Sequence, residues 1–108
     1  MVGSYEVRFT RAAEEDLIRL TDFLLDRAQD LEALNQVNAS IQTLRKAIEW
    51  QLSSTPWSFR KAGQGDRSTR REFVVPAGAS GYIALFEIES PTLVLVLAIR
   101  HQLEQDYH

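Results

Sequence analysis

The sequence predicts an α+β fold in which an antiparallel sheet packs on an antiparallel helix hairpin, with the element order β-α-α-β-β-β. Three observations support this class: an alternating stretch near the start, two successive segments with helical apolar spacing, and three apolar runs separated by turn residues in the last third. The chain has 108 residues, of which 44% are apolar, and this suffices for one domain with its own core. We therefore expect residues 1–108 to form a single domain.

The first strand is expected in the stretch YEVRF, where Tyr5, Val7 and Phe9 alternate with charged residues. Such alternation is typical of a strand with one buried face. Thr10 follows at a position where its hydroxyl can accept hydrogen bonds from the first free amides of a helix. Beyond it, apolar residues recur at helical spacing and predict an amphipathic helix. This stripe consists of Ala13, Leu17, Leu20 and Leu24.

A second helix is expected after Asp30, which can cap its start. Its apolar stripe has the same spacing and consists of Leu34, Val37, Ile41, Leu44 and Ile48. Pro56 pushes Thr55 away from helical geometry and ends the helix. Because the connection between the two helices is short, they should form an antiparallel hairpin.

Residues 56–70 are expected to form a loop, followed by three strands with the sequences REFVV, YIALFEI and TLVLVLAI. The short turns between these strands require them to run antiparallel. In the last strand, Leu93, Leu95, Leu97 and Ile99 are expected on one face, and Val94, Val96 and Ala98 on the other. One helix hairpin can cover one face of the sheet, so the other apolar face should need a partner.

Charge and composition limit the classes of function. The net charge is −3, with seven acidic residues between positions 14 and 32 and five basic residues between positions 60 and 71. The chain contains no cysteine, and no secretion signal or membrane-spanning run is visible. We expect a cytoplasmic protein that does not enter the membrane and uses no cofactor. The two histidines lack carboxylates at a ligand spacing, so no metal site is expected.

Four stretches carry a resemblance to a known family: YEVRFTRAAEEDLIRLTDFL, TRREFVVP, GYIALFEI and LVLVLAIRHQ. In order and spacing they are similar to the RelE/ParE superfamily of type II toxins over nearly the whole chain. Arg71 falls at the start of the family's Arg-led strand, and Tyr82 in its Tyr-containing strand. Arg100 and His101 fall at the basic tip of its final strand.

The resemblance implies a small toxin of a toxin-antitoxin module, as in plasmid stabilisation systems, neutralised by a cognate antitoxin that wraps around it. Together they would form a toxin-antitoxin hetero-oligomer. Expected antitoxin contacts are Leu17, Leu20, Leu24, Tyr82, Phe86 and Leu95. The family divides by target. ParE-like members poison DNA gyrase without nuclease chemistry, whereas RelE-like members cut messenger RNA in the ribosomal A site.

The two branches make different demands on the residues. Metal-free RNA cleavage needs a general base, a general acid and cations for the phosphorane, and here the candidates are Arg71, Arg100 and His101. RelE-like nucleases are strongly basic, whereas this chain is acidic overall. This difference favours the gyrase poison, for which no catalytic residue is expected. The ribosome-dependent endoribonuclease is the alternative, and an inactive binding module is a third hypothesis. The gyrase-binding residues are expected to be Arg60, Lys61, Arg67, Arg70 and Arg71.

Overall fold

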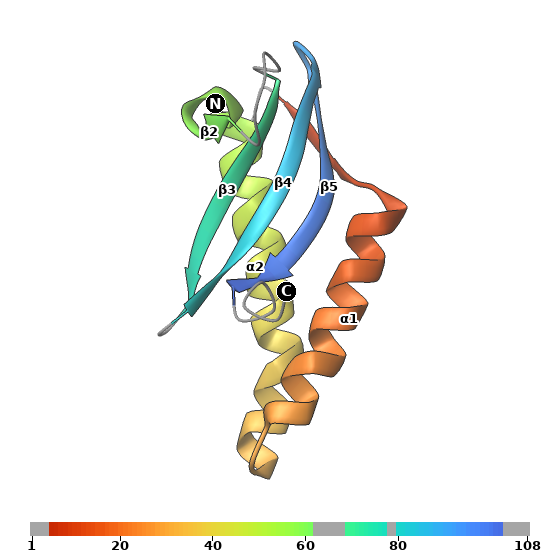
Figure 1. The fold of residues 1–108 in the computed structure, drawn as a ribbon, viewed down its shortest axis with the longest axis vertical. Coiled ribbons are helices and arrows are strands. Elements are labelled where there is room, and N and C mark those ends of the chain that lie inside the picture. Colours follow the sequence, from red (N-terminus) through yellow and green to blue (C-terminus); the bar gives the residue numbers. More distant parts are fainter. Residues whose placement is uncertain (1–4, 62–68, 78–79, 103–108) are drawn as a thin grey trace.

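A computed structural model describes residues 5–61, 69–77 and 80–102. This part of the chain forms two helices that cover one face of a five-stranded sheet (Figure 1). The elements are β1 (Glu6–Phe9), α1 (Arg11–Arg27), α2 (Leu31–Ser54), the 3₁₀ helix η1 (Pro56–Ser58), β2 (Arg60–Lys61), β3 (Arg70–Ala77), β4 (Ser80–Ser90) and β5 (Leu93–His101). The predicted α+β class and element order are confirmed, and η1 and the short strand β2 are additions in the expected loop.

The strand order in the sheet is β1-β5-β4-β3-β2. Strands β3, β4 and β5 are antiparallel, as the short turns predicted. Strand β1 runs parallel to β5, with Glu6 opposite Leu93 and Phe9 opposite Val96, so the sheet is mixed rather than fully antiparallel. No tight turn joins β1 to β5, and local connections therefore do not set their relative direction.

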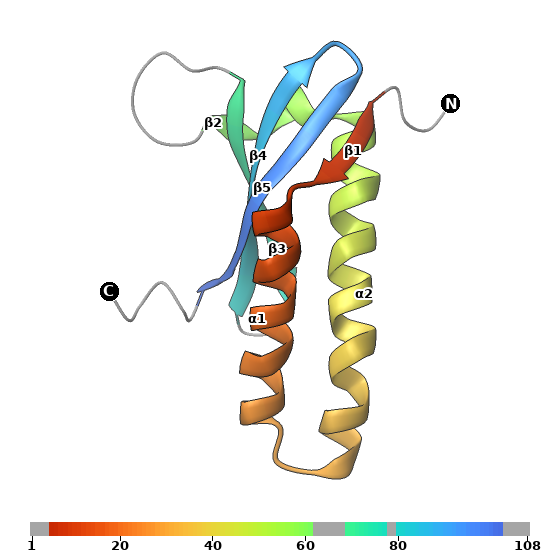
Figure 2. The same ribbon diagram turned by 90° about the vertical axis from the view of Figure 1, so that its right-hand side faces the viewer.

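Both helices begin at the predicted caps. The Thr10 hydroxyl accepts a hydrogen bond of 3.2 Å from the Ala13 amide, and an Asp30 carboxylate oxygen accepts one of 2.8 Å from the Ala33 amide. These caps satisfy amides that lack a partner within the helix. The two helices then run antiparallel and extend beyond the end of the sheet (Figure 2). At this projecting end Leu34, expected in the buried stripe, is 42% exposed.

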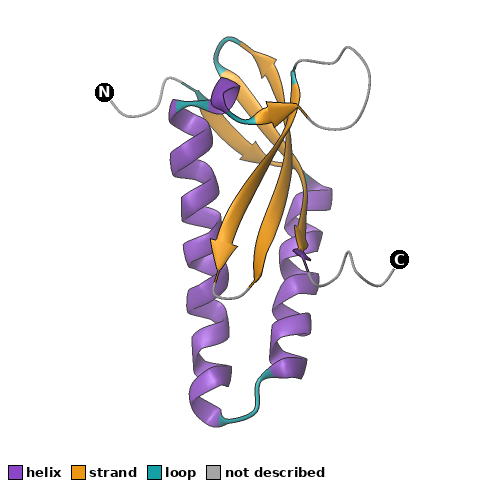
Figure 3. Ribbon diagram, turned by 60° about the vertical axis from the view of Figure 1, so that its left-hand side comes forward, coloured by secondary structure: helices purple, strands orange, loops and turns teal. Residues whose placement is uncertain are grey.

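The core lies between the helix hairpin and the sheet (Figure 3). Helix α1 contributes Ala13, Leu17 and Leu20, and α2 contributes most of its predicted stripe. The sheet contributes Phe73, Tyr82, Ala84, Phe86, Ile88, Val94, Val96 and Ile99. Burial of these side chains from both layers is the main source of stability in a domain of this size.

A β-bulge in β5 changes which residues face the core. Leu85 lies opposite Ala98 and Phe86 lies opposite Val96, so Leu97 is the extra residue. Because one inserted residue reverses the side-chain alternation, Ile99 is buried with Val94 and Val96. The expectation that Ile99 shares a face with Leu93, Leu95 and Leu97 is therefore wrong.

The sheet face opposite the helices is less exposed than its apolar sequence suggested. Its apolar side chains are half-buried, and these are Ile83, Leu85, Leu93 and Leu95. Three ion pairs flank them on the same face: Arg8 with Glu6, Arg60 with Glu72, and Arg70 with Glu87. Arginine stems can cover apolar surface while their charged ends stay in water. The exposed large apolar residues of the described chain lie mostly on the helices and η1, namely Ile18, Leu25, Leu31, Leu34, Trp50 and Trp57, with Val74 on the sheet.

Candidate functional site

The basic cluster predicted from the sequence lies on β2 and β3. We call Arg60, Lys61, Arg70 and Arg71 the basic hairpin; Arg67 lies outside the described residues. Two cations of the basic hairpin pair with acids of the same sheet face. Arg60 lies 3.1 Å from the Glu72 carboxylate, and Arg70 lies 3.1 Å from the Glu87 carboxylate. Arg60 and Lys61 are exposed at the edge of the sheet. The hairpin therefore presents positive charge to solvent, although acids on its own strands reduce it.

Arg71 has a structural role that the sequence did not reveal. Its side chain lies on the helix side of the sheet, where Nη1 donates hydrogen bonds to the carbonyl oxygens of Trp57, at 3.0 Å, and Phe59. The guanidinium also lies 5.0 Å from the centre of the Trp57 ring. The Trp57 indole in turn donates a hydrogen bond of 3.0 Å to the Tyr5 hydroxyl. Arg71 thus fastens η1 to the sheet. In the sequence, the feature that could have indicated this role is the pair of aromatic residues, Trp57 and Phe59, just before the basic cluster.

The three residues named for RNA cleavage do not converge. Arg100 and His101 are adjacent in β5, so their side chains lie on opposite faces of the sheet. Arg71 and His101 share the helix-facing side, but they lie opposite Phe86 and Tyr82 of β4, about 13 Å apart along the strand. The structure therefore does not bring Arg71, Arg100 and His101 together at one site.

His101 is a packed residue and not a surface one. It is 6% exposed, because the bulge at Leu97 turns its side chain towards the helices. Its ring centre lies 5.0 Å from that of Tyr82, in an edge-to-face arrangement, and 5.4 Å from that of Phe23 in α1. The imidazole therefore fills space between the sheet and α1.

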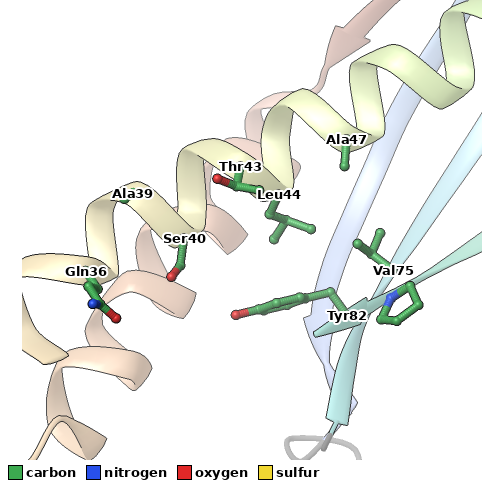
Figure 4. A pocket seen from close by; sticks show the side chains of 9 residues that line it. Gln36, Ala39, Ser40, Thr43, Leu44, Ala47, Val75 and Tyr82 are labelled. Atoms are coloured by element: carbon green, nitrogen blue, oxygen red, sulfur yellow. The ribbon is translucent and has the colours of Figure 1, made fainter. Parts of the chain in front are cut away.

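The residues predicted to bind an antitoxin fall into two groups. Leu17, Leu20 and Phe86 are at most 3% exposed and belong to the chain's own core, so their assignment as contact residues is corrected. Leu24 is half-buried where it packs against this core, and Leu95 is half-buried on the opposite face of the sheet. Tyr82 is also in the core through its ring, but its hydroxyl points into a surface groove (Figure 4).

This groove follows α2 along the margin of the sheet. Two neighbouring cavities of about 400 and 550 Å³ share the lining residues Thr43, Ala47, Val75 and Pro76. A third, of about 260 Å³, shares Gln36 and Ser40 with the first and reaches Leu24. We call these connected hollows the α2 groove. Its full lining is Leu24, Arg27, Ala28, Ala33, Gln36, Val37, Ala39, Ser40, Thr43, Leu44, Lys46, Ala47, Trp50, Gln51, Phe73, Val75, Pro76 and Tyr82.

The pKa shifts of the described residues reflect packing rather than a cluster of acid-base groups. Hydrogen bonds from the Arg45 guanidinium lower the pKa of Glu14 and couple α2 to α1. Burial raises the pKa of Tyr82, so its phenol stays protonated. Among the described residues, no group of three or more metal-ligating side chains comes together. Within the same residues, neither helix is sufficiently long and apolar to cross a membrane.

Comparisons with known proteins agree with this architecture. The sequence model of a family described as "ParE toxin of type II toxin-antitoxin system, parDE" matches residues 7–106. The solved structure titled "Chromosomal ParDE TA system from P. aeruginosa" superposes with a TM-score of 0.68 at 14% sequence identity, covering 91% of this chain and 96% of that chain. At this identity the structural match supports the fold alone. Comparison with curated protein sequences gives no match.

Proposed function

Since the chain belongs to the ParE toxin family of type II toxin-antitoxin systems, we propose that it acts in the cytoplasm by inhibiting DNA gyrase and is neutralised by a cognate antitoxin. The family match over residues 7–106 carries the toxin assignment. The choice of gyrase over messenger RNA is supported by one geometric observation: Arg100 lies on the sheet face opposite to Arg71 and His101, and His101 is only 6% exposed. Inhibition of gyrase requires a binding surface, and no proton transfer by the toxin.

The basic hairpin is the surface that we assign to the target. Arg60 and Lys61 lie on the short strand β2, at the opposite edge of the sheet from β1. Positive charge at an exposed edge speeds association with an acidic partner, and this effect weakens with added salt. Arg71 supports the same surface from behind, because it fixes the chain that leads into β2.

The target is tested by adding the purified chain to gyrase and following ATP-dependent supercoiling and trapped DNA cleavage. Inhibition of supercoiling is the expected result. The double variant Arg60→Gln/Lys61→Gln should inhibit more weakly, and its remaining activity should depend less on salt. The matched control is Arg8→Gln/Arg11→Gln, which removes the same charge at β1 and the start of α1.

A parallel cell-free translation reaction provides the opposing outcome. Arrest of translation with messenger RNA cuts in the ribosomal A site, and no effect on gyrase, would replace the gyrase assignment by the endoribonuclease. Equal loss of inhibition in the hairpin variant and in the control would show that total charge matters, and would remove the basic hairpin as a specific target surface.

A further inference from the structure

Trp57 in η1 is a large aromatic residue that the fold holds out into solvent. It is 46% exposed, although the chain is anchored on both sides of it. Pro56 is fully buried, and Phe59 packs on Phe73 with 4.5 Å between the ring centres. Because of these two anchors, the Trp57 ring is held at the surface next to the basic hairpin and does not fold back onto the core.

Three contacts fix the orientation of this ring. The indole nitrogen of Trp57 donates a hydrogen bond of 3.0 Å to the Tyr5 hydroxyl, and the Trp57 carbonyl accepts one of 3.0 Å from Arg71. The Arg71 guanidinium also lies over the ring, 5.0 Å from its centre, so the exposed area of the indole lies away from Arg71. A ring that is already fixed loses little conformational entropy when a ligand packs on it.

Lys61 lies beside Trp57 on the same face of the sheet. In the antiparallel pairing of β2 with β3, Lys61 is directly opposite Arg71, whose side chain reaches Trp57 on the helix side. Directly opposite residues of antiparallel strands have Cβ atoms about 4.5–5.5 Å apart, and like charges at such positions destabilise the pairing. An anion bound between these two cations would offset their repulsion.

The acids that pair with the basic hairpin lie on the other face of the sheet. Glu72 and Glu87 form their ion pairs with arginines on the face away from the helices. Because neighbouring positions of a strand point to opposite faces, Glu72 is directed away from the side of Arg71. Lys61 and Arg71 therefore place positive charge directly beside an exposed aromatic ring.

The site lies at one end of an electrically asymmetric molecule. Strand β2 is at the end opposite to the connection between α1 and α2 (Figure 1). Asp26, Asp30 and Glu32 flank that connection. The acids at the far end contribute to the net charge of −3, but they leave the surroundings of Lys61 attractive to an anion.

The combination of a ring and cations selects a ligand that has a flat ring next to negative charge. Nucleotide bases stack on exposed aromatic side chains with little dependence on sequence, and the adjoining phosphates bind lysine and arginine. A single strand presents free base faces, whereas in a continuous duplex each base face is covered by its neighbours. An acidic peptide would pair with the cations but leave the Trp57 ring in water.

We propose that Trp57 and Lys61 bind a nucleotide of DNA whose base face is exposed, with Trp57 stacked on the base and Lys61 on an adjoining phosphate. Arg71 is a positioning residue that holds the ring from behind. Binding of a single strand is a property of the chain alone. That this strand belongs to DNA held by gyrase rests on the proposed function, because gyrase cleaves its DNA and a break exposes the faces of the terminal bases.

The first test uses the full chain and a labelled oligodeoxythymidine of about 12 nucleotides, with binding followed by fluorescence anisotropy. Trp57→Phe and Trp57→Leu both lose the bond to Tyr5, but only phenylalanine keeps a ring. Trp57→Leu should therefore bind about tenfold more weakly than Trp57→Phe. Trp50→Leu, at the second exposed tryptophan, is the control and should leave the affinity unchanged. Circular dichroism and thermal melting verify that each variant is folded.

The salt dependence of binding separates the phosphate contact from the stacking contact. Lys61→Gln should reduce the slope of log affinity against log salt concentration by about 0.7, because one phosphate contact to a single strand is lost. Arg8→Gln removes an equal charge at β1, the other edge of the sheet, and should retain the wild-type slope. In a Trp50→Leu background, Arg71→Lys should weaken binding, retain the slope and lower the fluorescence anisotropy of Trp57.

Three results would overturn the proposal. The first is equal affinity of Trp57→Phe and Trp57→Leu, or equally strong competition, per phosphate, by a closed circular duplex. The second is equal competition by a polyglutamate peptide, which would assign the site to an acidic protein surface. The third is tighter binding of oligouridine than of oligodeoxythymidine, which would assign it to RNA.

A second experiment distinguishes this inference from the proposed function. Gyrase is assembled with the chain on iodouracil-substituted DNA and irradiated. The wild-type chain should crosslink to the DNA through Trp57, and Trp57→Leu should not. Inhibition of gyrase without any crosslink at Trp57 would overturn the placement of the site on gyrase-bound DNA. Failure of the wild-type chain to inhibit gyrase would contradict the proposed function and leave the oligonucleotide results standing.

Discussion

The carboxylate of Asp16 accepts a hydrogen bond of 2.8 Å from the backbone amide of Ile99, 83 positions further along the chain. The carbonyl of the same Ile99 accepts one of 3.1 Å from Arg19. Strand β1 ends opposite Val96, so without these contacts the outer edge of β5 would be open beyond that point. Two side chains of α1 thus take the place of a neighbouring strand and protect this edge from pairing with other chains.

Asp16→Ala should lower the free energy of unfolding by about 1–3 kcal/mol, because it leaves the Ile99 amide without its acceptor. Urea unfolding at pH 7 measures the change. Asp22→Ala, which alters an exposed acid of the same helix, serves as the control and should change stability by less than about 0.5 kcal/mol. Equal effects of the two substitutions would mean that helix charge, and not the contact with β5, is responsible.

Arg71→Lys should destabilise the chain by about 1–2 kcal/mol and alter the fluorescence of Trp57. Lysine keeps the charge but cannot reproduce the planar contact with the indole and the bonds to two carbonyls. Arg60→Lys, at an exposed ion pair, is the control and should change little. Should Arg71→Lys keep full stability and lose gyrase inhibition, Arg71 would be a direct target contact, as the sequence first predicted.

His101→Ala should cost about 2–4 kcal/mol of stability, since it empties the space between Phe23 and Tyr82. His101→Phe keeps a ring there and should retain toxicity in growth assays at matched soluble levels. Thermal melting separates loss of folding from loss of activity. If His101 transferred a proton, His101→Phe would lower activity by about 100-fold or more in a folded protein, and the non-enzymatic assignment would fail.

The pair formed by Glu14 and Arg45 should make stability depend on pH. The pKa of Glu14 is lowered in the folded chain, chiefly by the hydrogen bonds from Arg45. The pair therefore stabilises the fold above the pKa of Glu14 in the unfolded chain, and this contribution is lost as the pH falls through the lower, folded pKa. The stability difference between wild type and Glu14→Gln should be larger at pH 7 than at pH 3. Glu15→Gln, at an exposed ion pair with Arg11, should show a small difference at both pH values. A Glu14 difference that does not change with pH would contradict the assignment.

Most of the fold could be predicted because its signals are local. Thr10 and Asp30 cap their helices within three residues, and short turns fix the antiparallel order of β3, β4 and β5. The bulge at Leu97 could not be predicted, because the run TLVLVLAI alternates without a glycine or polar residue to mark an insertion. That one residue decides that Ile99 and His101 face the core.

The candidate site was harder to predict, because its residues acquire their roles from distant segments. The basic cluster was visible as charge, but the contacts of Arg71 depend on where η1 lies in space. Leu17 and Leu20 were identified as apolar positions of α1, yet the sequence did not distinguish a residue that faces the core from one that faces a partner. Tyr82 was selected by family resemblance, and its buried ring with a groove-facing hydroxyl could be recognised only from packing.

The position of β5 between β1 and β4 has a consequence for the time at which the chain can complete its fold during translation. On the ribosome both helices and the other strands are made before β5, yet β1 and α1 dock on that strand across more than 80 positions. Contacts of such long range form late in folding. Until β5 has been synthesised, the nascent chain lacks the strand that joins β1 to β4 and supplies Val94, Val96 and Ile99 to the core. A ribosome that stalls or a transcript that is cut before Leu93 therefore yields a fragment that cannot complete this core, so the folded domain comes only from synthesis that continues through β5.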